Sequence, residues 1–385
     1  GFAIVIMGNS LFGVECRADI NRSITEAKVE SSINGPKDAF VENIQINIGL
    51  IKKRLKSSKL KIENLYLGRK SLTNISIMYF DDVADLEMVK KIIDKLNIVD
   101  IDGIVDSSTV GFLLTGENNS IYPTFMETER PDIVAKCLLD GKVAIVVDTT
   151  SSVIILPAFF IDFINPGIDN YNKSKNVNFI KILRFTAFLI SMMAPALYIG
   201  VMNYNQETIP TSLLINFAIE RGGVPFPTII ETLIMLFVCE ILRESDLRFP
   251  SSYGSAISIL GAIVLGEASV SAGIASPITI IVISITFISS LTFTNIELNN
   301  ALRYFRIIFI VLAGLFGLYG VTLGLFYFLI YSTSTYSMNR NYFAPISPFN
   351  KEYFFESVLK EGVLKNNKRS SLFTKKNLTK MKVKK

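Results

Sequence analysis

Charged side chains recur inside a strongly apolar stretch of this chain, and that combination limits what it can fold into. The stretch runs from Ile209 to Pro277. Its ionisable residues include Glu220, Arg221, Glu231, Glu240, Arg243, Glu244 and Glu267. A charge at the centre of a lipid bilayer costs about 2.5 to 3.5 kcal/mol on insertion scales, so such residues usually face a bundle interior, a partner or water. We therefore expect a membrane region whose polar core matters.

Prolines and glycines divide the same stretch into short pieces. They are Pro225, Pro227, Gly254, Gly261, Gly266 and Gly273. Broken helices are tolerated at membrane depth where the freed backbone is buried in protein or lines a cavity. The sequence therefore predicts a polytopic membrane protein, in which Pro225 and Pro227 form a structural corner that ends one membrane-associated helix and starts the next.

The composition excludes several classes of function. The chain has 385 residues, is 50% hydrophobic and has a mean hydropathy of +0.41, with most of the apolar weight in its second half. Because it has no histidine, a Ser-His-Asp triad, a Cys-His pair and a histidine metal site are impossible. Its three cysteines, Cys16, Cys137 and Cys239, form no CxxC pair and indicate reduced thiols. We expect no enzyme activity, no cofactor and no metal site.

Residues 1 to about 170 alternate strand-like and helix-like pieces, which predicts a soluble α/β region. Phe2–Met7 has the length of an apolar strand, and Ala39–Lys56 places apolar residues at helical spacing. Asn74–Phe80, Asp85–Leu96 and Val99–Val105 then predict a strand, an amphipathic helix and a second strand in a βαβ-like order.

A second set of signals follows downstream. Pro131 starts a predicted helix at the position where proline is welcome, and Gly141 ends it. Lys142–Asp148 and Ser152–Leu156 then have the apolar content of buried strands.

The charged residues around Pro131 allow two interpretations. Glu129, Arg130 and Asp132 could form a charged hinge or an interface. They could equally cap the helix and pair at the surface.

Five apolar runs follow residue 171. They are Phe185–Met202, Phe226–Leu242, Ile257–Leu265, Ile278–Phe293 and Ile307–Tyr331. A membrane helix needs about 20 apolar residues, a length that only the first and the last two runs approach. Basic residues precede the first run and fill the tail, so the positive-inside rule places both ends in the cytoplasm. The number of crossings is then even. We expect four, with broken or re-entrant pieces between them, and six is the alternative.

The expected fold is therefore an α/β N-terminal region followed by an all-α membrane domain. Its parts are a first α/β subdomain at 1–70 that lacks its opening, a second at 71–170, a membrane domain at 171–335 and a basic cytoplasmic tail at 336–385. Much of the positive surplus behind the net charge of +5 lies in that tail, which indicates membrane lipid and no nucleic acid as a partner.

Several motifs in register resemble the A subunit of the GerA-type spore germination receptors. The motifs at 122–150, 219–227, 240–250 and 255–277 read YPTFMETERPDIVAKCLLDGKVAIVVDTT, IERGGVPFP, EILRESDLRFP and SAISILGAIVLGEASVSAGIASP. The pieces INGPKDAFVENIQINIGLIKKRLK and VDIDGIVD before them, and NYFAPISPF after them, match in the same order. The chain departs from the family in lacking the opening of the soluble domain and in its lysine-rich tail. The motifs fit the SpoVAF-type paralogues of the same family as well.

The resemblance implies a subunit of a nutrient-responsive complex in the inner membrane of the bacterial endospore. It implies a transporter-like B subunit and a lipoprotein C subunit as partners, and a homo-oligomer of A subunits around an ion pathway. Release of monovalent cations is the germination event that such a pathway would serve.

The segment Ser255–Ser276 fits part of this expectation. An oligomeric pore needs a helix with small residues for close packing and with polar atoms that replace the hydration of an ion. The candidate lining residues are Ser258, Gly261, Glu267 and Ser271. A ring of one Glu267 per subunit would attract cations. The alternative is a helix buried within one subunit, in which a protonated Glu267 only hydrogen-bonds between helices.

A second candidate is a polar core formed by Glu231, Glu240 and Arg243. The spacing of Glu240 and Arg243 is that of an ordinary ion pair on one helix, and Glu231 is the better functional candidate of the three. Two rival functions stay open. A solute transporter would use broken helices near the midplane, and a membrane enzyme would be limited to carboxylate chemistry around Glu231 and Glu267.

Overall fold

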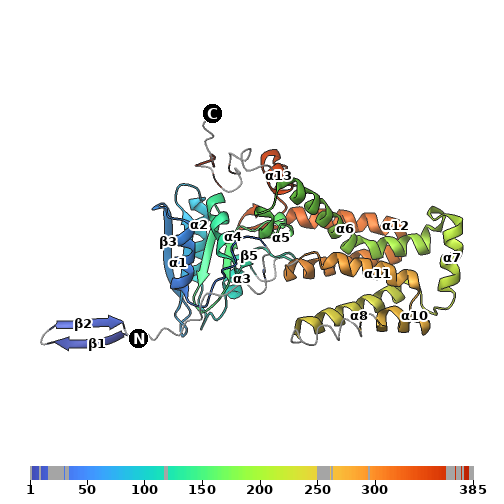
Figure 1. Ribbon diagram of the computed structural model, residues 1–385, viewed down its shortest axis with the longest axis horizontal. Coiled ribbons are helices and arrows are strands. Elements are labelled where there is room, and N and C mark those ends of the chain that lie inside the picture. Colours follow the sequence, from blue (N-terminus) through green and yellow to red (C-terminus); the bar gives the residue numbers. More distant parts are fainter. Residues whose placement is uncertain are drawn as a thin grey trace. The chain divides into compact units, whose positions relative to one another are not determined.

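The computed structural model describes residues 2–7, 10–15, 30, 34–116, 120–248, 261, 263–293, 295–360, 369, 374 and 377–380. The chain forms two compact units (Figure 1). The first, which we call the sheet unit, comprises Gly1–Gly116, Glu127–Leu156 and Lys368–Lys380. The second, the helical unit, comprises Glu117–Met126, Pro157–Asn367 and Met381–Lys385.

A five-stranded sheet forms the core of the sheet unit. Its order is β3-β4-β6-β7-β5, with bounds β3 Leu60–Leu67, β4 Thr73–Phe80, β5 Met126–Thr128, β6 Val143–Val147 and β7 Val153–Leu156. The pairs β3/β4, β4/β6 and β6/β7 are antiparallel. Every residue of β6 and β7 is buried, as their unbroken apolar sequences predict. A separate hairpin pairs β1 (Phe2–Met7) with β2 (Ser10–Glu15).

Helices pack around this sheet and have well-defined ends. They are α1 (Ile44–Arg54), α2 (Leu86–Ile98), α3 (Ser107–Thr115) and α4 (Pro131–Asp140). The side chain of Asp85 accepts a hydrogen bond from the N–H of Glu87 at the start of α2. Gly141 ends α4 in the left-handed conformation, with φ 103°. The predicted start of α4 at Pro131 and its predicted end at Gly141 are confirmed.

The strand predicted over Val99–Val105 is wrong. That segment contains no strand, and its Val105 side chain is 82% exposed. Both edges of β4 are occupied, by β3 and by β6, so no parallel strand can join it. The segment is instead tied to the start of β4, where the hydroxyl of Thr73 donates to the carbonyl of Ile104 at 2.7 Å. The boundary predicted after residue 70 falls in the turn between β3 and β4, two strands paired along their whole length.

Helices dominate the second unit. In chain order they are α5 (Phe160–Ile164), α6 (Ser174–Tyr204), α7 (Thr211–Arg221), α8 (Thr228–Arg248), α10 (Ser269–Ser271), α11 (Pro277–Ser290), α12 (Ile296–Ser334) and α13 (Lys351–Ser357). Shorter elements are the 3-10 helices Gly167–Asn170 and Gln206–Thr208, the π-helix Ile263–Ala268, and the hairpin of β8 (Tyr336–Ser337) and β9 (Arg340–Asn341). Among the helices described, α6 and α12 are long and apolar enough to cross a membrane, and α11 is a shorter apolar helix.

α12 folds back on itself at Gly317, whose backbone is non-helical with φ 62° and ψ −140°. The ring centres of Phe305 and Phe328 lie 5.2 Å apart, and those of Phe305 and Tyr331 lie 5.7 Å apart. In a straight helix, a rise of about 1.5 Å per residue would separate these positions by more than about 30 Å. α12 is therefore a helical hairpin that turns at a glycine, the residue that tolerates this positive φ.

The helices of this unit run between two ends. We call them the turn end, where Gly317 lies, and the open end, where α12 begins and finishes. α6 finishes at the turn end, because the hydroxyl of Tyr204 donates to the carbonyl of Gly314 at 2.6 Å. α8 starts there, because the hydroxyl of Thr228 donates to the side-chain oxygen of Asn203 at 2.7 Å.

α8 and α11 then run together toward the open end. Near the start of α8, Glu231 accepts a hydrogen bond from the N–H of Ser276, just before α11. Near the other end of α8, Arg243 contacts Ser290, the last residue of α11. α6, α8, α11 and the two arms of α12 therefore each run between the turn end and the open end.

An aromatic cluster lies at the open end of the helical unit. The rings of Tyr122 and Tyr342 stack at 5.1 Å, and the rings of Phe160 and Phe343 lie 4.8 Å apart. The hydroxyls of Tyr122 and Ser332 lie 2.8 Å apart. These contacts explain why Glu117–Met126 and the NYFAPISPF segment belong to the helical unit.

Candidate functional site

Glu231 lies in the first turn of α8 and is fully buried. Its Oε1 accepts hydrogen bonds from the backbone N–H of Ser276 at 2.6 Å and from the Ser276 hydroxyl at 2.8 Å. Ser276 is the N-cap of α11, so the carboxylate lies at the positive end of that helix dipole. Glu231 therefore fixes the start of α11 against α8.

The surroundings of Glu231 are polar but incompletely bonded. The hydroxyls of Tyr198, on α6, and Thr279, on α11, lie 2.9 Å apart. Oε2 of Glu231 and the hydroxyl of Thr232 are buried without a hydrogen-bond partner in the described part of the chain. One carboxylate oxygen is thus available to a further donor. Within the same described residues, no group of three or more Cys, Asp or Glu side chains could hold a metal ion.

Three arginines from two helices converge on the carboxylate of Glu240. Nε of Arg303 lies 2.9 Å from Oε2 of Glu240. Nη1 of Arg243 and Nη1 of Arg306 each lie 3.4 Å from one of its oxygens. The side chains of Arg306 and Arg243 are 4% and 10% exposed, whereas those of Glu240 and Arg303 are 26% and 28% exposed. These four residues, which we call the arginine cluster, are thus buried on one side and open on the other.

The buried arginines of the cluster also contact uncharged groups. Nε of Arg306 donates to the carbonyl of Ser191, on α6, at 2.7 Å. Arg243 donates to the hydroxyl of Ser290, and its guanidinium lies 4.8 Å from the ring centre of Phe287. The arginine cluster therefore joins α6, α8, α11 and the first arm of α12 at one level of the unit.

Two members of the arginine cluster, Glu240 and Arg243, are predicted by their spacing in the sequence, and the other two were missed. Glu240 and Arg243 form an ion pair at helical spacing, but the shortest ion pair of Glu240 is with Arg303, on another helix. The missed residues, Arg303 and Arg306, lie three positions apart just before the apolar run that starts at Ile307. That spacing puts both on one helix face and is the signal that could have found them.

The small-residue segment is partly a surface of the chain. Ser258 lies outside the described residues, and Gly261 packs closely, because a Cβ there would lie 3.0 Å from the side chain of Leu242. Gly266, Glu267 and Ser271 are exposed, and no atom would lie within 4 Å of a Cβ on Gly266. Among the described residues Glu267 has no hydrogen-bond or ion-pair partner, so it stays apart from both Glu231 and the arginine cluster.

Pro225 and Pro227 lie between the end of α7 at Arg221 and the start of α8 at Thr228. The carbonyl of Pro227 accepts a hydrogen bond from the N–H of Glu231 at 3.0 Å, so it belongs to the first turn of α8. No residue of α7 is buried. The two prolines therefore separate an exposed helix from a packed one.

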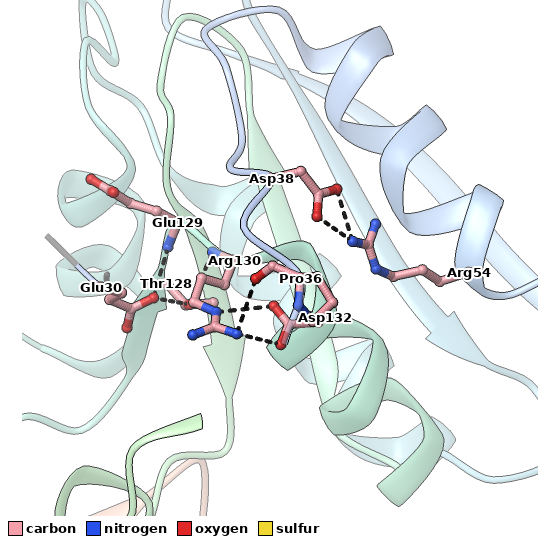
Figure 2. Close-up of polar contacts among 8 residues, drawn as sticks. All are labelled: Glu30, Pro36, Asp38, Arg54, Thr128, Glu129, Arg130 and Asp132. Carbon is pink, nitrogen blue, oxygen red and sulfur yellow. Dashed lines mark hydrogen bonds and ion pairs between the residues drawn. The ribbon is translucent and has the colours of Figure 1, made fainter. Parts of the chain in front are cut away.

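The sheet unit contains a buried ion pair at the start of α4 (Figure 2). Nε and Nη2 of Arg130 lie 3.0 and 2.8 Å from the two carboxylate oxygens of Asp132, and the side chains are 4% and 7% exposed. The interpretation as a surface pair is therefore wrong. Beside this pair, the carboxylate of Glu30 accepts a hydrogen bond from the hydroxyl of Thr128 at 2.5 Å. Burial raises the pKa of Glu30 above its ordinary value.

These contacts hold the segment before α1 against the start of α4. The N–H of Phe40 donates to the carbonyl of Glu129 at 2.9 Å. Asp38 accepts two hydrogen bonds from Arg54, at 2.6 and 2.8 Å, as Figure 2 shows. Because Arg130 and Asp132 are buried within one unit, they serve its packing.

Comparison with known proteins assigns the chain to a family. A family model described as Bacillus/Clostridium GerA spore germination protein matches residues 2–372. The chain belongs to the GerA family. Spore germination protein KA of Bacillus subtilis (strain 168) is 38% identical to this GerA-family chain over 331 residues, which are 86% of this chain and 61% of that protein. Spore germination protein GerQA of Bacillus cereus is 34% identical over 339 residues, which are 88% of this chain and 68% of that protein.

The GerA-family chain is also similar to a solved structure, the crystal structure of the N-terminal domain of the A subunit of the Bacillus megaterium spore germinant receptor GerK3. The sequence identity is 38% and the TM-score 0.27, and the match covers 32% of this chain and 97% of that domain. The chain spans 61% of the length of germination protein KA and 64% of that of YfkQ, an uncharacterized membrane protein of Bacillus subtilis (strain 168) that is 34% identical to it. The family assignment made from the motifs is confirmed.

Proposed function

We propose that this GerA-family chain is the membrane subunit of a nutrient-responsive spore germination receptor. Several copies would assemble around a path for monovalent cations that opens at the start of germination. The names of its relatives support the germination role. The observation that carries the cation path is the exposed carboxylate of Glu267 beside the exposed Gly266 and Ser271.

The surface of the helical unit supports its placement in a membrane. α6, α11 and α12 expose large apolar side chains, among them Phe179, Ile182, Ile281, Ile288, Leu315, Phe316 and Phe326. Soluble monomers rarely expose contiguous apolar surface of more than a few hundred Å². Lipid is the environment in which such helices are stable without a cover.

Six passes through the membrane agree better with this fold than the four first expected. The hairpin at Gly317 divides the last apolar run into two arms, which with α6, α8 and α11 make five passes among the described residues. The second arm, 318–334, spans about 25 Å, close to the roughly 30 Å thickness of the hydrocarbon core. An even number also keeps both basic ends on the cytoplasmic side.

Glu267 supports an assembly of several copies. A charged side chain facing lipid costs about 2.5 to 3.5 kcal/mol at the bilayer centre, so Glu267 must face water or another chain. Gly266 and Ser271 are equally exposed and leave room for close approach of a second copy. Symmetry would then place one Glu267 per subunit around an axis, and such a carboxylate ring attracts cations.

We further propose the inner membrane of the endospore as the location, with the sheet unit in the cytoplasm. A transporter-like B subunit and a lipoprotein C subunit are the proposed partners, because the motifs of this chain resemble the A subunit of receptors built in that way. In this role the chain is a conduit and catalyses no reaction.

Reconstitution of the purified chain into planar bilayers tests the proposal. Glu267→Gln keeps the shape and hydrogen bonding of the side chain but removes its charge. The K⁺ conductance is expected to fall several-fold while size-exclusion chromatography shows an unchanged assembly. Glu220→Gln is the matched control, because Glu220 is equally exposed but lies on α7, and it should conduct like the wild type. Normal conductance in Glu267→Gln would refute the lining role, and saturable solute uptake without conductance would favour a transporter.

A further inference from the structure

The arginine cluster carries more positive charge than its described neighbours neutralise. Three guanidinium groups face one carboxylate, which leaves two positive charges unmatched. Among the described side chains, Glu240 is the carboxylate that acts on both Arg243 and Arg306. A buried charge without a partner is costly, so a native cluster of this kind calls for a further anion.

The cluster also holds hydrogen-bond donors that nothing satisfies. Nε of Arg243 and Nη2 of Arg306 are buried and make neither a hydrogen bond nor an ion pair in the described part of the chain. Arg306 is the most buried of the three arginines, with a side chain that is 4% exposed. Buried guanidinium N–H groups are normally paired. Two unpaired donors on neighbouring arginines fit an acceptor that has more than one oxygen.

The open side of the cluster borders apolar surface. Arg303 is the partly exposed member, and its neighbours Tyr304 and Ile307 on α12 are 62% and 53% exposed. The apolar run of the first arm starts at Ile307 and continues toward the turn end. In the membrane placement proposed above, Arg303 thus lies where the hydrocarbon core meets the lipid headgroups.

We propose that the arginine cluster binds the phosphate of an anionic phospholipid headgroup at the open end of the helical unit. A phosphodiester offers two anionic oxygens, which match the planar donors of arginine. Basic pockets between membrane helices bind anionic headgroups in this way. Dissolved phosphate has the same chemistry, but the exposed side chains of Tyr304 and Ile307 provide a surface for acyl chains beside the headgroup. The inference rests on the membrane placement in the proposed function and is independent of the cation path.

Native mass spectrometry of the detergent-purified full chain tests this site. The chain is offered equal amounts of phosphatidylglycerol and phosphatidylcholine, and it should retain phosphatidylglycerol preferentially. Arg303→Gln should bind phosphatidylglycerol about five-fold more weakly, the contribution expected of one arginine near an anionic lipid surface. Lys175→Gln is the matched control, since it removes one positive charge from an exposed position at the start of α6, and it should bind like the wild type.

Glu240→Gln separates an anion site from a purely internal ion-pair network. Removal of the competing carboxylate should strengthen phosphatidylglycerol binding several-fold, and the added lipid should raise the melting temperature of this variant more than that of the wild type. A network that only serves packing would lose stability and gain no lipid. Arg303→Lys keeps the charge without the planar donors and should bind with intermediate strength, which covers the case in which Arg303→Gln does not fold.

Two outcomes overturn the proposal. One is unchanged phosphatidylglycerol retention in both Arg303→Gln and Glu240→Gln. The other is displacement of the lipid by millimolar inorganic phosphate with the same dependence on Arg303, which would assign the site to a dissolved anion. Conductance of Glu267→Gln is a separate measurement, so failure of the cation path and failure of the lipid site remain distinguishable.

Discussion

The two buried charge clusters of this chain are built differently. In the sheet unit, Arg130 and Asp132 form one bidentate pair with side chains at most 7% exposed. In the helical unit, three arginines share the carboxylate of Glu240, and Arg243 and Arg306 keep unpaired donors. In the sheet unit the buried arginine faces a carboxylate of its own, whereas the arginine cluster has more positive than negative charges and needs another anion. The contrast shows that charge balance, rather than burial, separates a structural ion pair from a candidate binding site.

Asp132→Asn should have the largest effect on stability. It leaves the buried Arg130 without its carboxylate, and breaking a buried pair from one side typically costs about 3 to 5 kcal/mol. The free energy of unfolding is measured by urea titration followed by circular dichroism, since the chain has no tryptophan. The control is Asp100→Asn, which breaks an exposed ion pair with Arg69 and should leave the midpoint unchanged. A loss as small in Asp132→Asn as in the control would contradict the structural role of the buried pair.

Glu231→Gln should have the next largest effect. The amide oxygen can still accept the bonds of Ser276, but the negative charge at the start of α11 is lost. A charge in such a position contributes about 1 kcal/mol, and up to about 2 kcal/mol where it is buried. Thermal unfolding of the detergent-purified chain should therefore show a lower midpoint, with Glu220→Gln unchanged. Unchanged stability together with altered conductance would instead assign Glu231 a role in the ion path.

Local signals in the sequence predicted much of the fold. Pro131 and Gly141 mark the ends of α4 through backbone chemistry that each residue carries by itself. The apolar runs that became β6 and β7 are continuous because both faces of those strands are buried. The strand expected over Val99–Val105 failed because pairing depends on which edges of β4 are free, and that is set by strands distant in sequence.

The candidate site depended more heavily on non-local contacts. Gly317 lies in an apolar run that is compatible with one long helix, and its positive φ becomes visible only when the two arms of α12 pack together. Arg303 and Arg306 are separated from Glu240 by more than sixty residues, so their spacing indicated a helix face but not the carboxylate that they share. Charge clusters of this kind require the packed structure.

Arg303→Gln tests whether the arginine cluster of the helical unit holds more arginines than Glu240 requires. Loss of either partner breaks the ion pair of the sheet unit. After Arg303→Gln, by contrast, Arg243 and Arg306 still pair with Glu240. The expected change in the free energy of unfolding without anionic lipid is therefore below about 1 kcal/mol, the range of partly exposed ion pairs. Thermal unfolding in a zwitterionic detergent measures it. A loss comparable to that of Asp132→Asn would show that Arg303 is a required partner of Glu240 and not part of an excess.

Glu30 gives the smallest expected effect, a pH dependence confined to the sheet unit. Burial raises its pKa in the folded chain above the ordinary value of 4.5. The folded state then binds this proton more tightly than the unfolded state, so the contribution of Glu30 to the free energy of unfolding falls as the pH rises above 4.5 toward the raised pKa. Asp82 has the opposite sign, because its hydrogen bond from Lys59 lowers its pKa and its contribution is lost on acidification. Urea midpoints measured between about pH 4 and pH 7 should therefore decline less steeply with rising pH in Glu30→Gln than in the wild type. Asp82→Asn should change the slope of the urea midpoint against pH in the other direction. Identical slopes in Glu30→Gln and the wild type would mean that Glu30 has the same pKa in the folded and the unfolded chain.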